Sequence, residues 1–185
     1  MRVDHNGLVY CPACGSETAA PYCAVCGAPI ANAELTVGSS QQLGGWWRRV
    51  GATFTDNIIL LLPTTVVLIL IGAIAGSLVG ALAGIATQGA YQVLLLSSPR
   101  GQTLGNRIVA TRVRDRNTGG PISTRQAMWR WGFIAAYSVI ALVNSPISTA
   151  IATVVALVDV LFPLANPMKQ TIHDRLAGTI VVTAS

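Results

Sequence analysis

Charged residues are scarce in this sequence. Only 10% of the 185 residues are Asp, Glu, Lys or Arg, whereas 52% are hydrophobic. Soluble domains carry roughly 25% charged residues, so the composition argues against a water-soluble domain and favours a membrane protein. No hydrolase, kinase or redox signature is present, and no nucleophile and base can be placed in one pocket, so we do not expect an enzyme. Residues 1–10 lack an apolar core, so we also expect no cleaved secretory signal.

Four apolar segments account for most of the chain. At 1.5 Å per residue, about 20 residues cross a hydrocarbon core of roughly 30 Å. The sequence therefore predicts an all-α membrane domain over residues 46–185, a bundle of four transmembrane helices at about 50–71, 77–96, 126–143 and 147–165. Residues 108–114 and 179–183 are rich in β-branched side chains, which predicts short strands in the central loop and the tail.

Basic residues mark one side of this bundle. All 12 Lys and Arg residues lie in the N-terminal region, in the stretch 99–130 or after residue 165, and the two opposite loops have none. The positive-inside rule places that side, with both termini, in the cytoplasm of a multi-pass protein of the cell membrane. Because the positive charge lies beside predicted spans rather than in a free domain, the net charge of +5 does not indicate nucleic-acid binding.

Four cysteines lie close together near the N-terminus, as two Cys-x-x-Cys-Gly motifs separated by eight residues: Cys11, Cys14, Cys23 and Cys26. This pattern is typical of a zinc ribbon, in which glycine lets the backbone turn around the metal. Disulfides or free thiols are the alternatives, but the cytosol is reducing, so residues 1–30 are predicted to bind one structural Zn²⁺. The ribbon lacks Lys and Arg between its outer cysteines, which favours a cytosolic protein partner over nucleic acid. Residues 31–45 are rich in small and polar residues, which predicts a flexible linker. We expect this linker to tether the ribbon without packing it against the membrane domain.

Charged and polar side chains occur inside the predicted spans. Asp56 and Asp159 each lie about 9 Å in from the cytoplasmic side, where an unpaired carboxylate is costly. We expect them to join one intramembrane polar cluster, in which the acids and arginines lie at similar depth and neutralise one another. Its members are Arg49, Asp56, Gln88, Gln92, Arg130 and Asp159. The cluster either fixes helix packing or exchanges a cation or proton. Asp174 is expected outside it, bound to an Arg of the 99–125 loop or capping a tail helix.

Small residues recur every four positions between the first two spans, at Gly72, Gly76, Gly80 and Gly84. Such a stripe lets helix backbones approach closely in lipid. It predicts close packing within the chain, with a homo-oligomer as the alternative.

Several motifs together resemble the RDD family of bacterial membrane proteins. They are Arg49 and Asp56 in the first span, Arg130 in the third, the run Gly101-Gln102-Thr103-Leu104-Gly105-Asn106-Arg107, and the run beginning His173-Asp174. The resemblance implies that Arg49, Asp56 and Asp174 are the Arg and two Asp of the family name, and that Asn106 stands where the family usually has Lys. A cation/proton antiport role attributed to some members is the only activity it implies.

Two functional hypotheses follow. In the first, the chain is a non-catalytic membrane module whose zinc ribbon recruits a cytosolic partner to the lipid bilayer. In the second, it is a small-ion transporter that uses the Asp/Arg cluster for cation/proton exchange. The first is favoured because four helices leave little room for an alternating-access path and no inverted repeat is visible.

The predicted topology can be tested by cysteine labelling in intact cells, in a background without other cysteines. An impermeant reagent should label Ser77→Cys and Ser145→Cys, which lie in or beside the outer turns, and should not label Arg116→Cys in the cytoplasmic loop. Labelling of Arg116→Cys would overturn the orientation.

Overall fold

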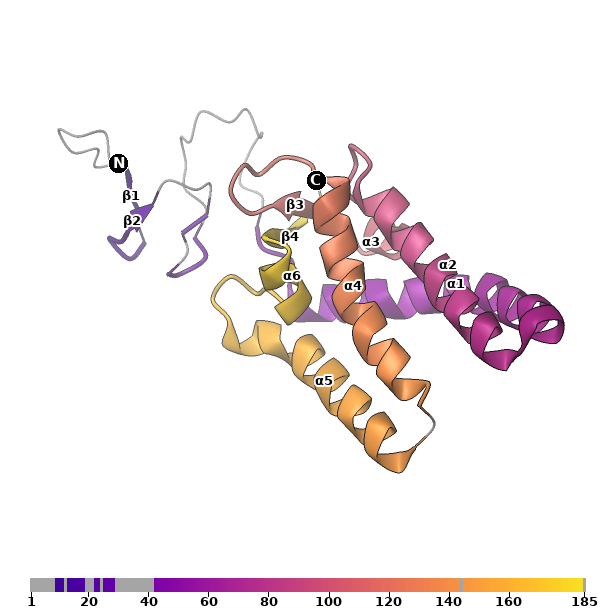
Figure 1. Cartoon of the computed structure of the whole chain (residues 1–185). Helices are drawn as coiled ribbons and strands as arrows, with labels where there is room; N and C mark the ends of the chain where they lie inside the picture. Colours follow the sequence, from indigo (N-terminus) through magenta and orange to yellow (C-terminus); the bar gives the residue numbers. More distant parts are fainter. Residues whose placement is uncertain are drawn as a thin grey trace.

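The computed structural model describes residues 9–11, 13–18, 22–23, 25–28, 42–143 and 145–184. Four long helices, labelled in Figure 1, form two antiparallel hairpins: α1 (Trp46–Ala75) with α2 (Ser77–Leu96), and α4 (Thr124–Ala141) with α5 (Pro146–Ala165). Short elements lie at the end where the hairpins meet: α3 (Leu104–Ile108), β3 (Thr111–Asp115), α6 (Ile172–Leu176) and β4 (Thr179–Thr183). Near the N-terminus, β1 (Val9–Tyr10) pairs antiparallel with β2 (Glu17–Thr18).

Three helices in the described part of the chain are long and apolar enough to cross a membrane, namely α1, α2 and α5. Helix α1 begins at Trp46, four residues before the predicted start of the first span, and it includes Pro63. Helix α4 is not among them. Its 18 residues are less apolar on average, in part because they include Arg125 and the buried Arg130. The structure therefore supports a membrane-embedded helical protein, and a fourth crossing by α4 stays a prediction.

The glycine stripe lies in the contact between α1 and α2. Gly76 forms the turn between them with φ of +93°, a conformation that side chains other than glycine rarely adopt. A Cβ added to Gly80 would come within 2.5 Å of the Leu68 carbonyl oxygen and 2.8 Å of the Gly72 Cα. Close packing within the chain, the first of the two predicted uses of the stripe, is thus observed. Homo-oligomerisation through the same glycines stays a prediction.

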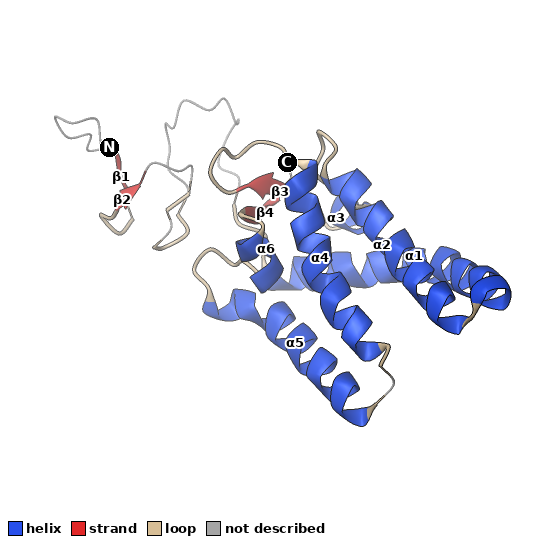
Figure 2. Ribbon diagram, in the orientation of Figure 1, coloured by secondary structure: helices blue, strands red, loops and turns tan. Residues whose placement is uncertain are grey.

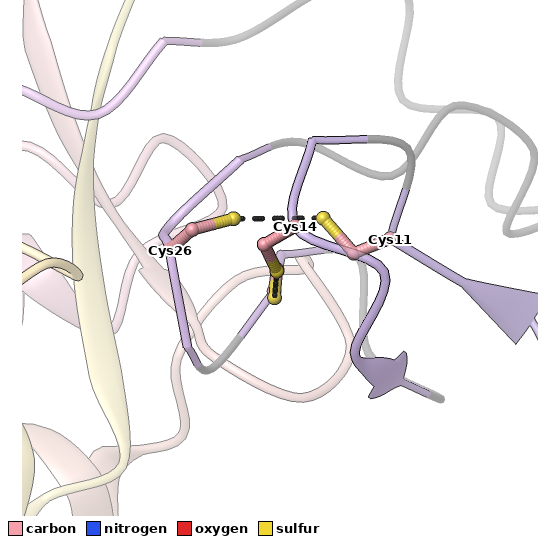
Figure 3. A group of neighbouring side chains, drawn as sticks. Cys11, Cys14 and Cys26 are labelled. Atoms are coloured by element: carbon pink, nitrogen blue, oxygen red, sulfur yellow. Dashed lines mark hydrogen bonds between the residues drawn. The ribbon is translucent and has the colours of Figure 1, made fainter.

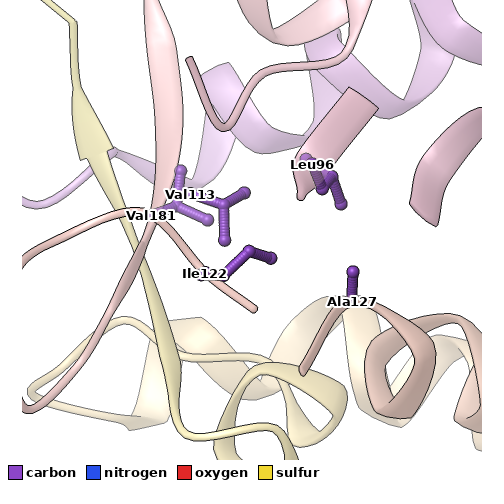
Figure 4. Close-up of a cluster of buried hydrophobic side chains, with 5 residues drawn as sticks. All are labelled: Leu96, Val113, Ile122, Ala127 and Val181. Carbon is purple, nitrogen blue, oxygen red and sulfur yellow. The ribbon is translucent and has the colours of Figure 1, made fainter. Parts of the chain in front are cut away.

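The short elements form a compact layer across one end of the hairpins, which we call the cap layer (α3, β3, α6 and β4). Strands β3 and β4 pair antiparallel from Thr111 opposite Thr183 to Asp115 opposite Thr179. Figure 4 shows the apolar cluster that attaches this sheet to the helices, made by Leu96, Val113, Ile122, Ala127 and Val181. The predicted strand at 179–183 is confirmed, and the predicted strand at 108–114 begins three residues later because α3 includes Ile108.

The cysteine-rich segment packs against the cap layer. Tyr22 is buried with Met168, Ile180 and Val182. A Cβ on Gly27 would lie 2.4 Å from the Pro167 carbonyl oxygen, so the two backbones are in close contact. The prediction that this segment is tethered without packing was wrong. The prediction rested on the small polar residues of the linker, and their composition carries no information about the apolar surface of the sheet on which Tyr22 packs.

Residues 42–44, which the sequence predicts to be part of the linker, extend the β3–β4 sheet instead. The amide of Gly44 donates to Val181 O at 2.8 Å, and the amide of Thr183 donates to Gln42 O at 2.8 Å. The remaining linker residues 31–41 lie outside the described residues.

The contact between α2 and α4 depends on Gly89, against which the Trp131 indole is seated. A Cβ there would lie 2.2 Å from Trp131 Cε2. We expect Gly89→Ala to lower the free energy of unfolding in detergent by about 1–3 kcal/mol, the usual cost of overpacking. Gly132→Ala is the matched control, because its added methyl group meets nothing within 4 Å beyond its chain neighbours and the adjoining backbone of its own helix. Equal stability of the two variants would contradict this packing.

Candidate functional site

The centre of the candidate site is one carboxylate between two guanidinium groups. Asp174 Oδ2 accepts a hydrogen bond from Arg49 Nη1 at 2.6 Å, and its Oδ1 accepts one from Arg130 Nη1. The Asp174 side chain is 0% exposed, and those of Arg49 and Arg130 are 10% and 9% exposed. The prediction that Asp174 lies outside the buried network was wrong. Its predicted role as a helix cap is confirmed, because Asp174 and Thr171 form the capping box of α6.

The same Arg130 side chain connects to a second acid through histidine. Its Nη1 donates to Thr179 Oγ1 at 2.6 Å, and its Nη2 lies 3.4 Å from His173 Nε2. Because Arg can only donate, His173 Nε2 must accept, so the ring carries its proton on Nδ1. His173 Nδ1 then donates to Asp159 Oδ2 at 2.7 Å. Burial lowers the pKa of His173, which favours this neutral form. Asp159 also accepts from the His173 amide at 3.1 Å, so it holds α6 against α5.

Asp56 binds a different cap-layer element. Its Oδ1 accepts from Tyr91 OH at 2.6 Å and from the Gly105 amide at 2.7 Å, while Oδ2 accepts from Thr103 Oγ1 at 2.6 Å. A Cβ on Gly105 would lie 2.2 Å from Ala52 O, so glycine permits this approach of α3 to α1. No ion pair joins Asp56 to an arginine among the described residues, contrary to the expectation of mutual neutralisation. Hydroxyl and amide donors solvate this carboxylate instead.

A cavity of about 570 Å³ brings the predicted polar residues together. Its lining includes all six members of the predicted cluster, Arg49, Asp56, Gln88, Gln92, Arg130 and Asp159. An adjoining cavity of about 650 Å³ shares Asn57, Gln88, Tyr137 and Ser138 with it and is lined by α1, α2, α4 and α5. The polar groups thus face a space between the two hairpins.

The run from Gly101 to Arg107 shapes the base of this site. Gly101 has φ of +63° and its carbonyl accepts from the Val113 amide at 2.7 Å. Gln102 Nε2 donates to Thr111 O at 2.7 Å, and Thr103 caps α3 through the Asn106 amide. Arg107, by contrast, is exposed. The motif therefore acts mainly by building the turn that presents Thr103 and Gly105 to Asp56.

Sequence reasoning missed Tyr91 and Thr179 as partners of the buried charges. Tyr91 precedes Gln92 in an apolar span, and Thr179 begins an apolar strand, so neither gives a local signal. Tyr91 contacts Asp56 and Thr179 contacts Arg130 only because the fold brings together segments that are distant in sequence.

A separate candidate metal centre lies in the cysteine-rich segment. The four sulfur atoms of Cys11, Cys14, Cys23 and Cys26 lie within 4.8 Å of one another, and Figure 3 shows three of these residues converging. Four thiolates so placed could hold one metal ion in tetrahedral geometry.

The two cysteine motifs have the same backbone form. Gly15 and Gly27 have φ of +74° and +72°, and each donates its amide to the carbonyl of the first cysteine of its motif at 2.8 Å. Hydrogen bonding, mainly with the Ser16 hydroxyl, lowers the pKa of Cys23 to about 6, which favours the thiolate that a metal requires. The tight turns predicted for the glycines are confirmed.

These features define a helical membrane protein with a buried Arg–Asp–Arg arrangement at one end. The family model described as the RDD family matches residues 43–178. Because this match covers more than half of the chain, the protein belongs to the RDD family. The search of curated proteins gave no match.

The charge of Asp174 should be essential for stability. We expect Asp174→Asn, which keeps the side-chain shape, to lower the free energy of unfolding by about 3–5 kcal/mol, because two buried guanidiniums lose their shared counter-charge. Arg175→Gln removes one charge from an exposed neighbour on α6 and should change stability by less than about 0.5 kcal/mol. Unfolding in detergent measures both. A similar small effect for the two variants would contradict the central role of Asp174.

Proposed function

We propose that the protein is a non-catalytic membrane module that presents a zinc ribbon to a cytosolic protein partner. The supporting observation is that the three acids of the site, two of them buried and Asp56 partly buried, are engaged by donors that join the cap layer to the helices. Asp56 binds α3, Asp159 binds α6, and Asp174 on α6 binds α1 and α4. Acids engaged in this way hold the cap layer firmly to the helices and do not form an exchangeable ion site. We call the cap layer together with the helices the platform.

The cysteine-rich segment lies on this platform and fits Zn²⁺. Zinc prefers four thiolates in tetrahedral geometry, and a ribbon of this size needs metal to fold. Val25, between Cys23 and Cys26, is 60% exposed, which supports contact of the second cysteine motif with an apolar surface of another protein. In this proposal four helices cross the cell membrane and both termini are cytoplasmic.

This proposal is tested on the full-length protein purified under reducing conditions. Metal analysis should give about one zinc per chain, as four cysteines in one cluster require. Proteins cross-linked to the wild-type chain in cells should be lost with Val25→Glu and retained with Asn117→Glu, which adds the same charge to an exposed cytoplasmic loop. Absence of zinc, or an unchanged cross-linked set with Val25→Glu, would contradict the proposal.

Cation/proton exchange is the second candidate, and the cavity lined by Asp56 and Asp159 favours it. Flux of Na⁺, K⁺ and H⁺ into liposomes tests this function. If the protein is an exchanger, Asp56→Asn should abolish flux in a correctly folded variant. Wild-type flux in that variant would exclude a transport role for Asp56.

A further inference from the structure

The two central arginines have more donors than the protein satisfies. Arg49 and Arg130 share the single carboxylate of Asp174. Arg49 Nη2 and Arg130 Nε are buried and have no hydrogen-bond partner among the described residues. An unsatisfied buried donor is costly, and more so when it carries charge. Two guanidinium donors of the pair therefore lack an acceptor from the described residues.

The neighbouring acids are engaged elsewhere. Asp159 accepts from both the ring and the amide of His173, and Asp56 accepts from Tyr91, Thr103 and Gly105. Neither forms an ion pair with Arg49 or Arg130 among the described residues. Among the described residues, Asp174 is therefore the only carboxylate in direct contact with either guanidinium.

The cavity beside these arginines is lined by both charged and apolar side chains. Arg49 and Arg130 line its 570 Å³ together with Asp56 and Asp159, whose carboxylates already accept hydrogen bonds from other groups. Phe54, Leu60, Ile134 and Val160 contribute apolar lining. Trp46 also lines it, and its indole Nε1 donates to Val160 O at 2.8 Å, which ties the start of α1 to α5. Tryptophan is typical of the level of lipid headgroups. A ligand with an anionic head and an apolar body matches this distribution.

We propose that the cavity binds one phospholipid, whose phosphate accepts hydrogen bonds from Arg49 and Arg130. Guanidinium groups match phosphate oxygens in geometry and charge. The apolar lining distinguishes a lipid from free phosphate, since inorganic phosphate leaves that lining without a partner. The site goes beyond the proposed platform, because a platform function requires no ligand between the helices.

The test measures lipid retained by the full-length protein in detergent, by native mass spectrometry, with dioleoylphosphatidylglycerol as the probe. We expect one lipid to be retained and to raise the melting temperature, as for any ligand that binds only the folded state. Dioleoylglycerol, which lacks phosphate, should bind at least about tenfold more weakly, the effect of losing a charge-assisted hydrogen bond. Inorganic phosphate alone should give no comparable stabilisation.

Two variants separate the site from the surface charge. Ile134→Trp fills the cavity while both arginines remain, and it should reduce retention at least about tenfold if its melting temperature without lipid is unchanged. If it unfolds, Arg130→Lys, which keeps the charge but removes the planar guanidinium, is tested in its place and should show the same loss. Arg175→Gln, on the exposed surface, should retain lipid as the wild type does. Equal retention of dioleoylglycerol, equal stabilisation by inorganic phosphate, or unchanged retention in the cavity variant would overturn the proposal.

Discussion

The structure depends on burying one carboxylate between two guanidiniums. Taking charges out of water costs several kcal/mol per ion, and only close pairing with good geometry offsets that cost. Asp174 meets this condition by giving one oxygen to Arg49 and the other to Arg130. Because these residues lie on α6, α1 and α4, the ion pairs can form only when the C-terminal segment packs across the end where the two hairpins meet (Figure 1). Their geometry therefore couples the tail to both hairpins.

The same principle recurs at the other two acids. Asp56 on α1 binds the backbone of α3, and Asp159 on α5 binds the backbone of α6. Each of these two carboxylates thereby satisfies an amide at the start of a short helix, which would otherwise lack a partner. The polar residues inside the spans thus fix the cap layer, and the β3–β4 sheet in that layer provides the apolar surface on which Tyr22 packs.

Local patterns in the sequence indicated the four long helices and the two strands of the cap layer, but not the helix α3 or the contacts between elements. Length and apolarity indicated the helices α1, α2, α4 and α5. The cysteine spacing indicated the four-sulfur cluster. Depth along a helix suggested that Asp56 would meet an arginine, yet depth does not specify which loop returns to that position. Asp174 pairs with Arg49 across 125 positions of sequence, a separation at which no local pattern carries information.

The central claim is that the acids of the site hold the cap layer to the helices, and hydrogen–deuterium exchange of the Asp56→Asn and Asp159→Asn variants tests it most directly. If each acid holds one element of the cap layer, Asp56→Asn increases amide exchange in residues 104–109 and leaves residues 172–177 protected. Asp159→Asn should give the reverse pattern, because its partner is the His173 amide. Unchanged protection of both segments, or equal loss across the whole chain in both variants, would contradict the account.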